Sequence, residues 1–324
     1  MVVTTIYVTR HGFRGNWTID HQTGTYATTT PSPTGIPSDP PLAGYGVLQS
    51  QQLAAALSEI KDPPITRVYS SPFYRCLQTI QPFVERSGIK EIRVSNSEWY
   101  GLARWDHPSP AIPSRLHELF PAYSLAYKPS IVPSKSGESI TDLHNRIAYA
   151  LQYIIHHADA EDAAPRMSAS QLLGTKGCDD GRGPRTAVLI CSHAASMIAI
   201  GRVLTGTMPE DLWEDDFKTY TCGISKFERR NLKVPEGEGP TEKSGTFIAG
   251  RELGIPNVNW RNGRGLLGGW NCVMNGDCSH LDGGEERGWH FQGDEAFHSG
   301  EFIDKEGSEP QGDDRNEQKQ IPKL

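Results

Sequence analysis

Blocks of apolar residues alternate along the chain between two periodicities, one typical of strands and one typical of helices. Continuous β-branched and aromatic runs are typical of strands buried on both faces. Residues 2–9 form such a run, and residues 186–192 are predicted to be another buried strand; residues 65–69 are predicted to be a short strand, and residues 89–94 are strand-like. Apolar residues at helical spacing follow them, at residues 46–60, 71–86, 139–157 and 194–204. This alternation predicts an α/β fold, a three-layer α/β/α sandwich around a mainly parallel central sheet.

Local signals mark where several of these elements begin and end. Ser71 is predicted to be an N-cap with Pro72 in the first helical position. Residues 20–41 and 158–184 are rich in Gly, Ser, Pro, Thr or Asp and are predicted to be irregular loops. Asn275-Gly276 predicts a type I′ hairpin within a glycine-heavy, β-rich C-terminal extension.

Composition divides the chain into three regions. We expect a main domain at 1–234, a Gly/Trp-rich extension packed on it at 235–302, and a disordered acidic tail at 303–324. Residues 281–324 carry 12 acidic and 5 basic side chains, which leaves 27 of each sign in residues 1–280. No basic patch for direct nucleic-acid binding is expected. Neither a membrane span nor a signal peptide is evident, and six scattered cysteines favour reduced thiols in the cytoplasm, the nucleus or both.

Three predicted strands run directly into residues that suit a phosphate group. The first is followed by Arg10-His11-Gly12, the second leads to Arg75 in the first turn of a helix, and the third is followed by His193 at a helix start. The carboxyl ends of parallel strands form the ligand-binding edge of such sheets, and helix N-termini attract anions. Each motif alone is as well explained by a structural role. Together and in order, they predict an anion pocket that contains two histidines.

The same segments resemble the histidine phosphatase superfamily, which includes the phosphoglycerate mutases. The motifs are Arg10-His11-Gly12, SPFYRCLQT from Ser71, EWYG from Glu98, Gly137-Glu138-Ser139 and Ser192-His193. Within the superfamily, the chain is similar to a fungal branch that contains a subunit of the RNA polymerase III factor TFIIIC and its free-standing relatives. Residues 269–291, which include GGEERGWHF, also resemble that branch.

This resemblance implies a role for each of five catalytic residues. His11 would attack phosphorus as a neutral imidazole whose other nitrogen donates to a backbone carbonyl. Arg10 and Arg75 would hold the phosphoryl oxygens, and His193 would lie beside the transferring group. Glu98 would protonate the leaving oxygen and then activate water. This scheme requires neither a metal nor a cofactor.

Further residues are expected at the substrate. Arg14 adds a cation or is a surface arginine near the pocket, and Asn16 either binds substrate or forms an Asx-turn. The aromatic residues after Glu98 either line the entrance or pack in the core. The candidate substrate-binding residues are Arg14, Asn16, Gly12, Ala194 and Tyr100, and Trp99 and Trp105 are further candidates for the entrance.

Three functions fit these motifs. The first is a phosphatase that acts on a small phosphorylated substrate or a phosphopeptide. The second is a scaffold related to the TFIIIC subunit, with transcription-factor subunits as partners. The third is a phosphoglycerate-type mutase, which would have to exclude water. The presence of all five proposed catalytic residues favours an enzyme, because a scaffold needs none of them. These residues are His11, His193, Arg10, Arg75 and Glu98.

Overall fold

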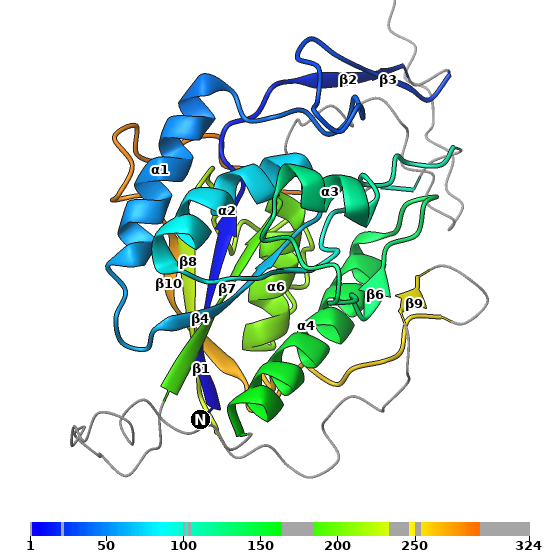
Figure 1. Cartoon of the computed structure of the whole chain (residues 1–324). Helices are drawn as coiled ribbons and strands as arrows, with labels where there is room; N and C mark the ends of the chain where they lie inside the picture. Colours follow the sequence, from blue (N-terminus) through cyan, green and yellow to red (C-terminus); the bar gives the residue numbers. More distant parts are fainter. Residues whose placement is uncertain are drawn as a thin grey trace, which may run out of the picture.

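A six-stranded sheet forms the centre of the computed structural model, which describes residues 2–20, 23–99, 101–102, 105–163, 185–232, 246–249 and 254–291. The strand order is β10-β8-β1-β7-β4-β5, and Figure 1 shows the arrangement. β1, β7, β4 and β5 pair in parallel, whereas β8 is antiparallel to both of its neighbours. The strands are β1 Val2–Arg10, β4 Ile65–Ser70, β5 Ile92–Val94, β7 Arg185–Ser192, β8 Ile224–Arg229 and β10 Trp270–Asp277.

Helices cover both faces of this sheet. The side chain of Tyr7 packs into one apolar core with α1, α2 and α3, while its neighbours Ile6 and Val8 pack into a second core with α4 and α6. Two cores arise because successive side chains of a strand point to opposite faces. The helices are α1 Gly44–Ser58, α2 Tyr74–Ser87, α3 Pro113–Leu119, α4 Ile140–Ala163 and α6 Ala194–Thr205. The predicted three-layer α/β fold with a mainly parallel sheet is therefore confirmed.

Some predicted boundaries are wrong. The strand expected at 89–94 begins only at Ile92. The helix expected at 139–157 continues to Ala163, because apolar residues persist at helical spacing and bury Ala158 against the sheet. The first six residues of the predicted 158–184 loop are therefore helical, and residues 164–184 lie outside the described residues.

The predicted cap of the second helix is also wrong. This helix begins at Tyr74, and Phe73 in the N-cap position makes no side-chain cap. The Ser71 hydroxyl is instead 2.8 Å from Nε2 of His193. The backbone N–H of Tyr74 donates to the Asp39 carboxylate at 2.9 Å. A remote carboxylate thus replaces the local cap, and Ser71 contacts a histidine.

The hairpin predicted at Asn275-Gly276 does not form. Both residues lie inside β10, where the pairing with β8 shifts register between Met274 and Asp277. The Asn275 side chain bonds the backbone of Asp216 and Lys218 at 3.0 and 2.9 Å. Gly276 has a φ of +69°, and a Cβ there would lie 2.6 Å from the Lys218 side chain. The Asn-Gly pair therefore suits an irregular strand that lies against residues 216–218, rather than a turn.

Among the described residues, four short strands lie outside the central sheet. β2 Trp17–Asp20 and β3 Thr25–Thr28 form an antiparallel hairpin, so the beginning of the predicted 20–41 loop is regular. β6 Ile131–Val132 pairs with β9 Phe247–Ile248. The sequence does not predict these pairs, because each strand is too short to show a clear period.

The C-terminal extension contributes directly to the central sheet through β10. Residues 235–245 and 303–324 lie outside the described residues, so the proposed division into three regions stays a prediction.

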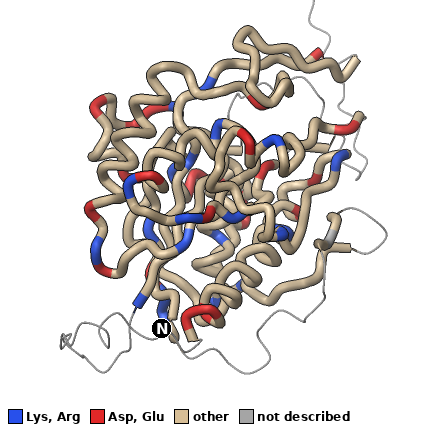
Figure 2. Tube along the Cα trace, in the orientation of Figure 1, with Lys and Arg blue, Asp and Glu red and all other residues tan. Residues whose placement is uncertain are grey.

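Basic and acidic positions are interspersed along the described chain (Figure 2). None of its described helices is both long and apolar enough to cross a lipid bilayer.

Candidate active site

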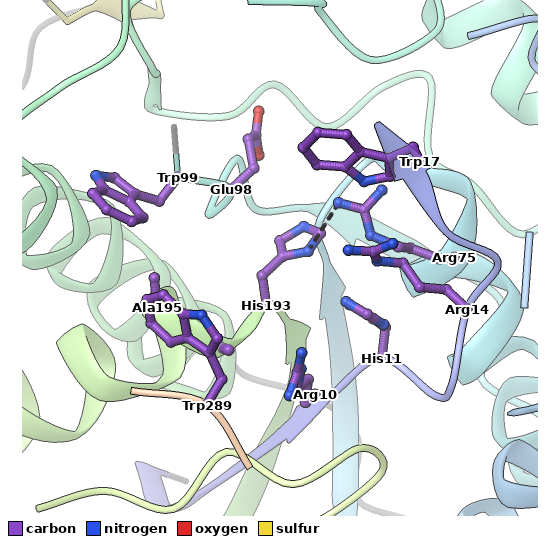
Figure 3. A pocket seen from close by; sticks show the side chains of 11 residues that line it. Arg10, His11, Arg14, Trp17, Arg75, Glu98, Trp99, His193, Ala195 and Trp289 are labelled. Atoms are coloured by element: carbon purple, nitrogen blue, oxygen red, sulfur yellow. Dashed lines mark hydrogen bonds between the residues drawn. The ribbon is translucent and has the colours of Figure 1, made fainter. Parts of the chain in front are cut away.

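The carboxyl ends of β1, β4 and β7 bring four of the predicted residues to one cavity of about 70 Å³. Arg10 is the last residue of β1, and His11 follows it. Arg75 lies in the first turn of α2, and His193 joins β7 to α6. All four side chains line the cavity together with Glu98, and Figure 3 shows their arrangement.

His11 is held as a neutral imidazole with one nitrogen available. Its Nδ1 is 2.8 Å from the carbonyl oxygen of Gly12, so Nδ1 carries the proton and Nε2 is the basic atom. Burial, followed by the charges of Arg75 and Arg10, lowers the pKa of His11 well below its usual value of 6.5. Gly12 fits here because a Cβ would lie 2.9 Å from the carbonyl oxygen of Gly46 in α1.

His193 is the second buried imidazole. Its Nδ1 lies 3.3 Å from Nη2 of Arg75, and an arginine can only donate, so Nδ1 is the acceptor. Its Nε2 is then the donor to the Ser71 hydroxyl at 2.8 Å. Burial and the charges of Arg75 and Arg10 also lower its pKa well below 6.5. The two rings lie edge to face with 5.4 Å between their centroids, and both line the site cavity.

Each arginine of the site is fixed by backbone or carboxylate oxygens. Arg10 is buried, and its Nη1 donates to the carbonyl oxygens of Thr219 at 2.9 Å and Arg287 at 2.5 Å. Arg75 forms an ion pair with buried Asp39 at 3.3 Å. A guanidinium that is held in place offers its remaining N–H groups to phosphoryl oxygens without further ordering.

Glu98 is a buried carboxyl with an unusually high pKa. Only 3% of its surface is exposed, and its Oε2 has no hydrogen-bond partner among the described residues. Burial outweighs the nearby charge of Arg146 and raises the Glu98 pKa to about 7. A carboxyl group with this pKa is suited to donate and accept protons near neutral pH.

The loop that carries Glu98 is held by a buried ion pair. Arg146 on α4 pairs with Glu138, and both are buried. The same guanidinium donates to the backbone carbonyls of Asn96 and Glu98, each at 2.5 Å. Glu138 belongs to the Gly137-Glu138-Ser139 motif, and its contacts place it behind the Glu98 loop rather than in the cavity.

The structure separates the candidate substrate-binding residues. Ala194 lines the site cavity, whereas Gly12 and Asn16 line a second, adjoining cavity of about 330 Å³. Arg14 lines both cavities. Tyr100 lies outside the described residues.

Of the further aromatic candidates, only one lines the site cavity. Trp99 does so. The ring of Trp105 instead lies close to Gly24 in the β2–β3 turn, where a Cβ would be 2.7 Å from it.

The described residues contain no cluster of three or more His, Cys, Asp or Glu side chains that could hold a metal ion.

Several lining residues were not predicted from the sequence. Trp17, Ala195 and Trp289 line the site cavity, and Arg287 lines the adjoining one. Trp289 packs against Trp99, with centroids 6.3 Å apart. A sequence signal for Arg287 and Trp289 did exist, because both lie in GGEERGWHF, the segment that resembles the fungal branch.

Comparisons with known proteins bear on the family and the fold of the chain. Residues 6–165 match the model of the histidine phosphatase superfamily, branch 1. The chain belongs to the histidine phosphatase superfamily. It is 30% identical over 306 residues to the "Transcription factor tau 55 kDa subunit" of Saccharomyces cerevisiae, covering 90% of this chain and 59% of that protein. The chain thus spans less than two thirds of that relative's length.

A solved structure shows the same fold. The ecdysone phosphate phosphatase of Bombix mori, determined in complex with tungstate, matches with a TM-score of 0.50 and 18% identity. The match covers 76% of this chain and 97% of that one. At this level of identity the similarity supports the phosphoglycerate mutase-like fold alone, and the chemistry has to be argued from the site.

Proposed function

We propose that this histidine phosphatase family member hydrolyses phosphomonoesters through a phosphohistidine on His11. The main support is one combination of observations. A neutral imidazole with a basic Nε2, two fixed arginines and a carboxyl group of pKa about 7 line the same cavity. The N-terminus of α6 at Ala194 and Ala195 adds a positive partial charge.

In the first step, the Nε2 lone pair of His11 attacks phosphorus as the bond to the leaving oxygen breaks. Glu98 gives its proton to that oxygen, so the alcohol leaves neutral. Arg10 and Arg75 hold the non-bridging oxygens, and His193 lies beside them. Most of the rate enhancement then comes from positioning and from charge stabilisation.

In the second step, the Glu98 carboxylate takes a proton from water, which attacks the phosphohistidine. The phosphorus–nitrogen bond breaks, and its electron pair returns to His11 Nε2. Inorganic phosphate leaves, and Glu98 is protonated again for the next cycle. The same carboxyl thus acts as acid and then as base.

Rapid quenching tests the nucleophile. A brief reaction stopped with alkali should leave acid-labile phosphate on the peptide that contains residues 10–14. His11→Ala should abolish both the label and turnover. His157→Ala is the matched control, because His157 is exposed near the far end of α4. Label on His193 would mean that the two histidines have exchanged roles.

A second function is favoured by one observation, the similarity to a transcription-factor subunit over 90% of this chain. In this alternative the chain is a nuclear scaffold related to the TFIIIC subunit. The tagged chain should then co-purify with the other subunits of that factor, and His11→Ala should co-purify equally well. Turnover without such association would favour the free-standing enzyme.

A further inference from the structure

The cavity that adjoins the site is lined by more positive charge than a phosphate group needs. Its lining includes Arg10, Arg14 and Arg287, and no acidic residue. The site cavity adds Arg75 and Glu98. A phosphomonoester dianion carries two negative charges, which Arg10 and Arg14 balance at the phosphoryl end, because Arg75 is already paired with Asp39. Arg287 is then a fourth cation to one side.

Arg287 reaches this position through an unusual backbone conformation. It has a φ of +50°, a region that bulky residues rarely adopt and that often occurs at functional sites. Its carbonyl oxygen accepts the hydrogen bond from Arg10 Nη1. Its guanidinium carbon lies 3.9 Å from the centroid of the Phe13 ring. The backbone therefore touches a site arginine while the side chain lies over Phe13, at the wall of the second cavity.

The segment around Arg287 is fixed against the end of the sheet. Thr221 donates its backbone N–H to the carbonyl of Glu286 at 3.2 Å. The Thr219 hydroxyl donates to the carbonyl of Trp289 at 2.6 Å and accepts from its backbone N–H at 3.1 Å. One face of the Arg287 guanidinium rests on Phe13, which leaves its planar N–H edge available for a bidentate ligand. None of the ion pairs among the described residues involves Arg287.

We infer that Arg287 binds a second anionic group on the substrate, a carboxylate or another phosphate, while the phosphoryl group occupies the site beside His11. This inference rests on the proposed function for its substrate class. Asn16 and Thr18 line the same cavity and supply polar contacts to the linker between the two groups. The preferred substrates are therefore small phosphomonoesters with two separated anionic groups.

Binding of stable phosphonates tests this inference without relying on turnover. Calorimetry would compare ethylphosphonate with 3-phosphonopropionate and ethylene-1,2-diphosphonate. The wild-type chain should bind one or both two-anion ligands roughly three- to tenfold more tightly, because an exposed ion pair is weak and a bidentate one is stronger. Comparing the two ligands separates a carboxylate from a second phosphate.

Two substitutions assign the preference to Arg287. Arg287→Asn removes the charge and suits a positive φ, so the preference should fall to near unity. Arg287→Lys keeps the charge and should keep part of the preference. Arg185→Gln is the matched control, because Arg185 is an exposed arginine at the amino end of β7, opposite to the site. This control should retain the full preference.

Each other outcome has a separate meaning. Equal binding of all three phosphonates by the wild-type chain overturns the inference. A preference that persists in Arg287→Asn also overturns it and assigns the second group to Arg14. Loss of turnover on every substrate, with the phosphonate preference intact, contradicts the proposed hydrolysis but leaves the anion site standing.

Discussion

The site cavity has two walls of different origin. Arg10, His11 and His193 follow directly from parallel strands, whose hydrogen bonds fix their positions. On the other side of His193 in Figure 3, Trp289 comes from a C-terminal segment held by Thr219 and by aromatic contacts. This strand-end wall, together with Arg75 in the first turn of α2, carries the groups that the proposed chemistry uses at phosphorus. In the proposed function, the second, C-terminal wall contributes size, shape and outer charge, and these properties would select the alcohol part of the substrate. Under this proposal, reaction and selectivity come from different parts of the chain.

The largest effect should come from Glu98, which lies above the strand-end wall in Figure 3. Glu98→Gln cannot donate a proton, so phosphorylation of His11 by alkyl phosphates should slow by about 10²–10⁴-fold. Aryl phosphates should lose much less, because a phenolate leaves without protonation. Single-turnover measurement isolates this first step from hydrolysis of the phosphoenzyme. Chelator should leave both rates unchanged, since the scheme uses no cation.

Asp106 supplies the control for that experiment. It is an exposed carboxylate eight residues after Glu98 and lies outside the lining of the site cavity. Asp106→Asn should leave both substrates' rates intact. An equal loss on alkyl and aryl substrates in Glu98→Gln would indicate a binding role for Glu98 rather than proton donation.

The second effect concerns the ion pair behind Glu98. Arg146→Met leaves Glu138 buried without its partner and frees the carbonyls of Asn96 and Glu98. Breaking a buried pair in this way costs about 3–5 kcal/mol, measured as the free energy of unfolding in urea. Adding Glu138→Gln should restore part of that stability. An additive loss in the double variant would show that the two residues do not act as a pair.

An exposed ion pair on the molecular surface provides the comparison. Arg115 and Glu118 form an ion pair at 3.0 Å with both side chains exposed. Arg115→Gln should cost less than about 1 kcal/mol, because solvent screens exposed pairs. If Arg146→Met and Arg115→Gln lowered the free energy of unfolding by similar amounts, there would be no reason to regard the Arg146–Glu138 pair as the support of the site.

The third effect is a pH dependence with a defined sign. Glu98 acts as an acid in the first step, so its protonated form is the active one. Its pKa of about 7 predicts that alkyl phosphate rates hold below pH 7 and fall above it, by up to tenfold per pH unit. The lowered pKa of His11 keeps the nucleophile neutral near pH 6.5. In single-turnover profiles Glu98→Gln should lack the fall above pH 7; retention of that fall would assign it to another group.

The contrast between the walls also explains what the sequence could predict. Arg10, His11, Arg75 and His193 lie in short motifs beside buried strands, so the order of motifs alone brings them to one edge. Their assignment as site residues rests on local signals of this kind. The Ser71 contact with His193 competes with the helix cap that the sequence predicts.

Long-range contacts account for most of what was missed. Asp39 approaches Arg75 across 36 residues, and Arg287 approaches Arg10 across 277. No local period encodes such contacts, because they depend on how distant segments pack. The Asn275-Gly276 signal failed for the same reason, since the backbone of Asp216 and Lys218 supplies hydrogen bonds that a turn would not use.

The smallest effect should come from removing residues 303–324. Their sequence contains too few apolar residues to bury, so we expect unchanged activity and a melting temperature within about 2 °C of the full chain's. Ending the chain at residue 244 should instead destabilise it strongly, because Trp260 and Trp270 are fully buried and β10 pairs with β8. Calorimetric melting of both truncations compares the two ends directly. A stable and active 1–244 fragment would show that the strand-end wall is sufficient and that the C-terminal wall is an independent appendage.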